Sequence, residues 1–305
     1  MNITFSIFPK FCQHLSAEQL AQFVKDVGLD TTNLVIRDGY WVTMDGLAAQ
    51  APAFVKTMAK AGLKVTFATA GFSPDMLTFE TFVRTKNPLK ILADSGITEF
   101  RMNYFRVEDG DVRKSFQAAR GKLELMLEVC EQAKVRAIYQ VHHGTLFPSA
   151  SAVFGLVYGL DPNWIGVELD PGNQAWEGYE RPELSVGLLG EYLRAFGIKD
   201  VSWMRDESKK AEPRKGWKQD WATLDEGIVN WYDVLRQLKR VEFEGTFVWM
   251  PFYDTGDFEA HKRKLKREVA YMRKVVAEVE AEAAVKKAEE ARAAAEAAAR
   301  NAEQA

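Results

Sequence analysis

The chain has 305 residues, of which 47% are hydrophobic and 27% charged, and its formal net charge is -3. This is the balance of a globular protein with one large core, and it excludes the strongly basic surface typical of nucleic-acid-binding proteins. No run of about 18 apolar residues occurs, so no membrane span is expected. The N-terminal MNITFSIFPKF lacks the features of a secretory signal, and Cys12 and Cys130 are far apart. We therefore expect a cytoplasmic protein with two idle thiols.

Short β-rich runs alternate with longer stretches of helical period along most of the chain. In chain order, the expected elements are a strand at 3–8, a helix at 16–28, a strand at 32–39, a helix at 46–61, a strand at 63–70, a helical region at 74–94 with a break before Pro88, a strand at 97–105, a helix at 112–133, a strand at 135–144, a helix at 152–160, a strand at 164–172, a helix at 182–193, a strand at 193–201, a charged loop at 202–228, a helix at 231–238 and a strand at 245–253. Eight such units predict an α/β fold, a (β/α)8 TIM barrel with parallel strands.

From about Asp257 the helical pattern continues to the end of the chain. Its first half carries apolar residues such as Leu265 and Val269 that can cover the barrel as an eighth helix. After Val285 the composition is almost entirely Ala, Glu, Lys and Arg, which favours a local helix with little to bury. We expect a barrel over 1–280 and a helical tail over 281–305. The tail is either solvated or forms a weak coiled coil in a homo-oligomer.

Polar residues collect where several of the predicted strands end. In a TIM barrel the catalytic groups point inward from these ends, and inward residues alternate along each strand. The candidates are Arg37, Arg101, Asn103, Gln140, His142, His143, Glu168, Asp170 and Lys199. A single member could be half of an internal ion pair, but burying this many charges is costly unless they pair, bind a metal or serve a ligand. The ensemble therefore predicts a site at one end of the barrel.

At these residues the chain resembles the sugar phosphate isomerase/epimerase superfamily, the xylose-isomerase-like TIM barrels. YQVHHG, IGVELDPGNQ, IKDV and LDEGIVNW fall, in order, at that family's motifs for strands five, six and seven and for the turn before the seventh helix. The resemblance implies a divalent cation (Mn, Mg or Zn) held by Glu, Asp, His and Glu, with the two Glu residues moving a proton next to a carbonyl. The matching positions here are Gln140, Asp170, Gly197 and Met250.

Only Asp170 keeps a ligand type that suits such a cation. We therefore expect no metal at the usual place, with two alternatives. A relocated metal site could use His142, His143, Glu168 and Asp170. Otherwise, the chemistry needs no metal: Lys199 is a cation beside the substrate carbonyl, and Glu168 or His142 is the base.

The expected function is that of a sugar isomerase or epimerase in carbohydrate metabolism. Its substrate is a sugar, a keto-sugar or a sugar-phosphate-like molecule. The alternative is a non-catalytic carbohydrate-binding or scaffold protein on the same barrel. Glu168, Lys199 and His142 are the expected catalytic residues. The substrate-binding residues are expected to be Arg37, Arg101, Asn103, Gln140, His143 and Trp176. Further aromatic side chains that could pack against sugar rings are Tyr40, Trp41, Tyr104, Phe105 and Trp203.

Overall fold

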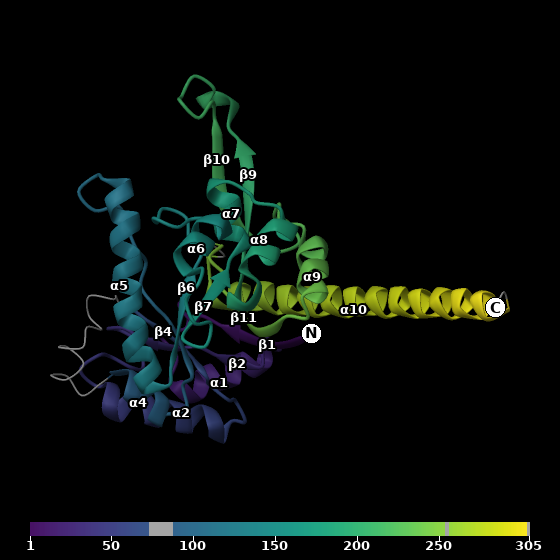
Figure 1. Ribbon diagram of the computed structural model, residues 1–305. Coiled ribbons are helices and arrows are strands. Elements are labelled where there is room, and N and C mark those ends of the chain that lie inside the picture. The colour runs from purple at the N-terminus through teal and green to yellow at the C-terminus, as the bar shows by residue number, and fades with distance from the viewer. Residues whose placement is uncertain (73–87, 254–255, 304–305) are drawn as a thin grey trace.

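The predicted barrel is confirmed. The computed structural model describes residues 1–72, 88–253 and 256–303 (Figure 1). Nine strand segments form one parallel sheet in the order β2-β1-β11-β8-β7-β6-β5-β4-β3. Their bounds are β1 Asn2–Ile7, β2 Thr31–Thr32, β3 Leu34–Ile36, β4 Phe67–Ala70, β5 Glu99–Arg101, β6 Arg136–Gln140, β7 Ile165–Leu169, β8 Leu193–Ile198 and β11 Glu244–Trp249.

The barrel closes through an interrupted strand, because β2 and β3 are two halves of the predicted second strand. They are separated by Asn33, β2 pairs with β1, and β3 pairs with β4. The Asn33 side chain bridges the gap inside the barrel: it accepts from Ser6 Oγ at 2.7 Å and donates to Thr69 Oγ1 at 3.3 Å. Eight strand positions therefore surround the axis, as expected for this fold.

Helices follow the strands and cover the outside of the barrel. Their bounds are α1 Ala17–Asp26, α2 Leu47–Lys60, α4 Pro88–Asp94, α5 Val112–Ala133, α6 Ala150–Val157, α7 Pro171–Glu177, α8 Pro182–Leu189 and α9 Trp231–Arg240, with one-turn helices η2 Gly190–Tyr192 and η3 Glu207–Lys209. Ser16 caps α1 with a complete capping box, and Asp111 caps α5. Most of the predicted 74–94 helix lies outside the described residues. The sequence reading missed α7, which begins directly after Asp170.

The expectation of a charged loop at 202–228 was wrong. Strands β9 Asp200–Arg205 and β10 Trp217–Ala222 form an antiparallel hairpin there, which projects from the barrel in Figure 1. The hairpin is anchored at its base by the buried Asp200, whose carboxylate accepts from Val201 N, Val229 N and Trp231 Nε1. Trp203, Trp217 and Trp221 lie on one face of the hairpin, and this shared face becomes clear only when the two strands are paired.

Inside the barrel, a layer of apolar residues lies next to the polar residues of the C-terminal rim. Phe67, Ile138 and Ala195 form a small cluster inside the barrel. The larger core lies between the strands and the surrounding helices. Because the interior positions alternate along each strand, Arg101, Gln140 and Glu168 point into the barrel near the strand ends. Their surroundings are therefore low in water.

The last helix, α10, runs from Phe258 to Glu303 and extends far beyond the barrel (Figure 1). Leu265, Val269 and Met272 are buried against the core, whereas the described side chains from Val285 onward are exposed. The part of α10 that packs on the barrel ends near Glu282, which pairs with Arg236 of α9 at 2.9 Å. Cys12 and Cys130 are both buried and unpaired. Among the described helices, none combines the length and apolarity that crossing a membrane requires.

Candidate functional site

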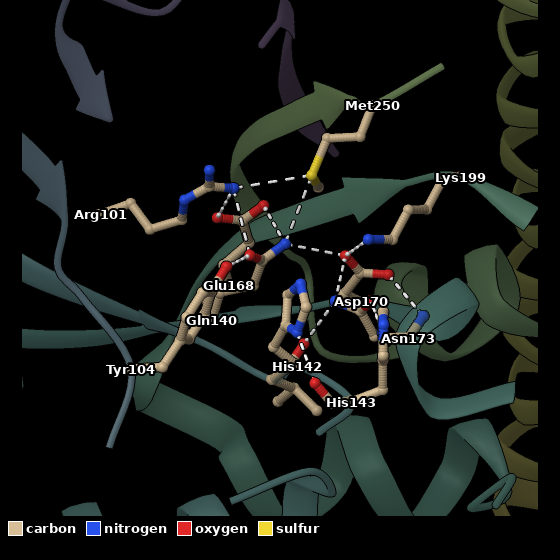
Figure 2. Close-up of polar contacts among 11 residues, drawn as sticks. Arg101, Tyr104, Gln140, His142, His143, Glu168, Asp170, Asn173, Lys199 and Met250 are labelled. Carbon is tan, nitrogen blue, oxygen red and sulfur yellow. Dashed lines mark hydrogen bonds and ion pairs between the residues drawn. The ribbon is translucent and has the colours of Figure 1, made fainter. Parts of the chain in front are cut away.

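A connected cluster of polar side chains lies at the C-terminal end of the barrel (Figure 2). Arg101 ends β5, Gln140 ends β6, and Glu168 is the fourth residue of β7. Asp170 follows β7, and Lys199 follows β8. The five side chains come from four adjacent strands, and the parallel register aligns Gln140 with Glu168. The barrel thus brings together the residues that the sequence placed at separate strand ends.

Gln140 is the centre of this cluster. Its Nε2 donates to Asp170 Oδ2 at 2.8 Å and lies 3.3 Å from Glu168 Oε1. Its Oε1 accepts from Tyr104 Oη at 2.5 Å and from Arg101 Nη1 at 3.2 Å. The orientation of the amide is therefore fixed, since donors face the oxygen and carboxylates face the nitrogen.

Asp170 uses its carboxylate for contacts within the protein. Its Oδ1 caps α7 by accepting from Asn173 N at 2.9 Å. Its Oδ2 accepts from Gln140 Nε2 and Asn173 Nδ2, each at 2.8 Å, and lies 3.2 Å from Lys199 Nζ. Asp170 is completely buried. The two donated hydrogen bonds use both lone pairs of Oδ2, and the Lys199 ammonium group occupies the space beside it, so this oxygen is poorly placed to bind a metal ion.

The other positions of the usual metal cage do not fit a hard divalent cation either. Gly197 has no side chain, and a Cβ built on it would lie 2.6 Å from Asp170 Oδ2 and 2.9 Å from Met250 Cε. The Met250 thioether, a soft ligand, lies 3.6 Å from Arg101 Nη1 and 3.4 Å from Gln140 Nε2. In the described part of the chain, His, Cys, Asp and Glu form no group of three or more suited to a metal. The relocated site of His142, His143, Glu168 and Asp170 is not among such groups in this arrangement, and it stays a prediction.

Lys199 is a buried cation held by one carboxylate and two rings. Only 3% of its surface is exposed. Its Nζ lies 4.7 Å from the Trp221 ring centroid and 5.1 Å from that of Phe252. The ion pair with Asp170 is too oblique for a hydrogen bond, so Nζ has no aligned acceptor among the described residues. Burial lowers the pKa of Lys199, and Asp170 opposes that shift.

Glu168 is the most perturbed carboxyl group of the cluster. It is completely buried, and burial raises its pKa to about 7, with Asp170 adding to the effect and Arg101 and Lys199 opposing it. Arg101 Nη1 is 3.8 Å from Oε2, which is too far for a hydrogen bond. Oε2 accepts no hydrogen bond from any described residue. Glu168 is therefore a carboxyl group with one unused oxygen and a pKa near neutrality.

Two histidines connect this cluster to the mouth of the barrel. His143 Nδ1 and Asn173 Oδ1 are 2.8 Å apart, and Asn173 continues the link to Asp170. His142 Nδ1 lies 2.7 Å from the carbonyl oxygen of His143. Burial and the nearby Lys199 charge lower the pKa of His142 to about 3, so its ring stays neutral. With Nδ1–H donating to that carbonyl, the lone pair is on Nε2.

Aromatic rings form a continuous wall beside the histidines. His142 stacks on His143 at 4.4 Å, His143 on Trp176 at 5.2 Å, and Trp176 on Trp221 at 4.5 Å between ring centroids. Tyr104 covers the other side of His142 at 4.5 Å. The wall places apolar ring surface directly beside the buried charges, which suits a ligand that has both apolar faces and hydroxyl groups.

Two of the proposed substrate-binding residues lie outside the buried part of the cluster. Arg37 and Asn103 are exposed at the rim: Arg37 lies over the Tyr40 ring, and Asn103 Oδ1 accepts from Tyr104 N. Trp41 and Phe105 pack on the core instead of facing the cluster.

The sequence reading missed the roles of Tyr104 Oη and of Asn173 as linkers, and it gave Trp221 and Phe252 no part in the site. The DPGN motif at residues 170–173 held a signal for Asn173, because the residue three positions after a helix-capping Asp lies beside the Asp carboxylate.

The fold and the cluster define a xylose isomerase-like barrel. The profile of the family described as "Xylose isomerase-like TIM barrel" matches residues 21–275, so the chain belongs to this family. No functionally curated protein matches it in sequence.

Solved structures with the same fold include a xylose isomerase domain protein from Alicyclobacillus acidocaldarius, which is 14% identical with a TM-score of 0.67 over 91% of this chain and 99% of that one. D-psicose 3-epimerase, crystallised in the presence of D-fructose, is 12% identical with a TM-score of 0.66 over 90% and 99%. The 3-keto-D-glucoside 4-epimerase of E. coli is 13% identical with a TM-score of 0.63 over 90% and 99%. At these identities the likeness establishes the fold alone.

Proposed function

We propose that this protein is a sugar isomerase or epimerase that moves a proton to and from the carbon next to a substrate carbonyl, and that it does so without a divalent cation at the usual place. The observation that carries the proposal is Glu168, a buried carboxyl group with a pKa of about 7 and an unused oxygen, which is bracketed by two cations. Neighbouring structures of the same fold include sugar epimerases, which supports the reaction class.

Glu168 is the better of the two candidate bases. A general base works best when its pKa lies near the working pH, and Glu168 meets that condition. His142, with a pKa of about 3, is too weak a base to take a proton from carbon. Its neutral ring instead presents Nε2 as an acceptor for a substrate hydroxyl group. In the proposed reaction, the Glu168 carboxylate takes the proton from the carbon next to the carbonyl and returns it to the former carbonyl carbon of the enediolate, while the proton of the neighbouring hydroxyl group moves to the former carbonyl oxygen.

Lys199 and Arg101 supply the positive charge that the family's metal ion would otherwise provide. Removal of a proton next to a carbonyl leaves negative charge on the carbonyl oxygen, and a preorganised cation in a dry site stabilises it. Lys199 Nζ has no aligned acceptor among the described residues, so its N–H groups can point to a substrate oxygen. The proposal requires Arg101 to shift and admit substrate to Glu168. Among the described residues, its Nη1 is held by one 3.2 Å hydrogen bond to Gln140 and by longer contacts to Met250 and Glu168.

The test is exchange of substrate protons with solvent. Purified protein treated with a chelator is incubated in D2O with a panel of ketohexoses and their phosphates, and NMR follows deuterium at the carbon next to the carbonyl. Glu168→Gln should slow the exchange by at least about 100-fold, the usual contribution of a general base. Glu99→Gln is the matched control, because Glu99 pairs with Arg136 at 2.6 Å at the start of β5, the opposite end of the barrel. Exchange that persists in Glu168→Gln, or that needs added Mn2+, would refute the proposal.

A second function, binding of carbohydrate without catalysis, is favoured by one observation. Glu168 and Asp170 are both completely buried, as expected for a structural ion-pair layer. In that case the wild-type protein would bind a sugar of the panel in calorimetry and would show no exchange. The same two measurements therefore separate the two functions.

A further inference from the structure

One face of the β9–β10 hairpin carries a row of tryptophans that starts at the proposed active site. The register pairs Trp203 with Gln219 and Val201 with Trp221, so these side chains share a face with Trp217. Trp203 lies diagonally between Trp217 and Trp221, where large side chains on neighbouring strands reach one another. Trp221 and Trp217 are four residues apart along β10, a distance of about 13 Å.

The inner end of the row belongs to the site. Trp221 contacts the Lys199 ammonium group and stacks on Trp176. The outer end is open: Trp203 is 39% exposed and Trp217 is 45% exposed. Large exposed rings gathered on one face are unusual on a protein surface without a ligand or a partner. The row therefore extends the ring wall of the barrel mouth outward along the hairpin.

The row borders a cleft between the hairpin and the end of α7. The cleft has a volume of about 720 Å3 and is lined by Trp176, Glu177, Trp203, Arg214, Trp217 and Gln219. Two hydrogen bonds hold its walls in place: Trp203 Nε1 donates to Ala175 O at 3.0 Å, and Gln219 Nε2 donates to Trp176 O at 2.9 Å. The cleft is thus formed before any ligand arrives, which lowers the entropic cost of binding.

The lining combines flat indole faces with planar polar groups. Arg214 Nη1 donates to Gln219 Oε1 at 2.9 Å, and Glu177 Oε1 accepts from Gly144 N at 2.9 Å, so these polar groups are oriented. A pyranose ring has apolar C–H faces that pack on indole and equatorial hydroxyl groups that need donors and acceptors at the edge. An apolar protein segment would leave Arg214 and Glu177 partly unpaired.

We infer that this cleft binds a second sugar ring, so that the substrate is a disaccharide or a glycoside whose reacting unit lies in the barrel. The inference rests on the proposed function, because the first ring occupies the site of Glu168 and Lys199. Trp176 separates the two rings: it stacks on His143 and Trp221 at the site and also lines the cleft.

Calorimetry with defined sugars tests the inference. The probes are D-fructose and D-glucose as single rings, and lactulose, cellobiose and maltose as two-ring ligands. At least one disaccharide should bind the wild-type protein about tenfold more tightly than either monosaccharide. Trp217→Ala should remove about tenfold of that affinity, in keeping with the loss of one ring contact, while Trp217→Phe should keep most of it. The matched control is Tyr158→Ala, since Tyr158 is exposed at the C-cap of α6 and outside the cleft.

Three outcomes would overturn the inference, and they differ in their consequence for the proposed function of the barrel site. If monosaccharides bind and no disaccharide binds more tightly, the cleft is not a subsite, and the proposed function stands. If Trp217→Ala leaves disaccharide binding intact, or instead dissociates a dimer in light scattering, the tryptophan row has another role. If no sugar of either kind binds, both proposals fail together.

Discussion

Replacing Glu168 by Gln should change how the stability of the protein depends on pH. Burial raises the pKa of this carboxyl group from an ordinary 4.5 to about 7 in the folded protein. In the unfolded chain the group loses its proton near 4.5. Between these pH values the folded state holds a proton that the unfolded state lacks, so stability falls as pH rises, and the loss is complete above about pH 7.

The size of the effect follows from the same two values. Each pH unit of difference corresponds to about 1.4 kcal/mol, so ionising Glu168 inside the barrel costs about 3 kcal/mol of unfolding free energy. A Gln side chain has nearly the same shape and does not ionise. The wild-type protein should therefore lose about 3 kcal/mol relative to Glu168→Gln between acid and alkaline pH, and most of this loss falls between pH 5 and pH 8.5.

Urea unfolding of both proteins at intervals from pH 5 to pH 8.5 measures this difference. Taking the difference is essential, because burial also raises the pKa of Asp200 to about 7 and that of Glu268 to about 8. Both groups are present in the two proteins and cancel. A difference in unfolding free energy that stays constant across this range would show that Glu168 ionises normally, and the assignment of Glu168 as a base near neutral pH would be wrong.

Three further predictions follow from the site and the tail. Gly197→Ala should destabilise the protein by about 1–3 kcal/mol and abolish proton exchange, because the new Cβ would lie 2.6 Å from Asp170 Oδ2; an unchanged melting curve would contradict the crowding described at this position. Elemental analysis of the purified protein should find less than stoichiometric Mn2+, Mg2+ or Zn2+. About one equivalent of metal that Asp170→Ala removes would show that Asp170 binds a metal ion after all. Truncation after Val285 should leave the melting temperature nearly unchanged, because the described side chains beyond it are exposed; a large drop, or loss of an oligomer, would show that the tail packs on a partner.

The sequence predicted the elements whose signals are local. The helix at 112–133 matches α5 at both ends, because Asp111 provides a cap and the apolar period fits a helix throughout. The first helix begins after Ser16 for the same reason. The alternation of Glu168 and Asp170 along one strand also placed both near the rim before any strand pairing was known. The hairpin was missed, since neither strand is apolar enough alone and only their pairing reveals the shared face.

The amino-acid sequence by itself determined the eight alternating units, the family and the end of the barrel where the charged residues meet, because caps, periodicity and strand alternation act over a few neighbouring residues. The tertiary structure decided the rest. Gln140 connects the carboxylates of Glu168 and Asp170 by hydrogen bonds, and the Asp170 carboxylate occupies the space beside Gly197. Arg37 stays exposed at the rim. These contacts depend on the register of strands far apart in the chain, and the pKa of Glu168 depends on the water that the closed barrel excludes.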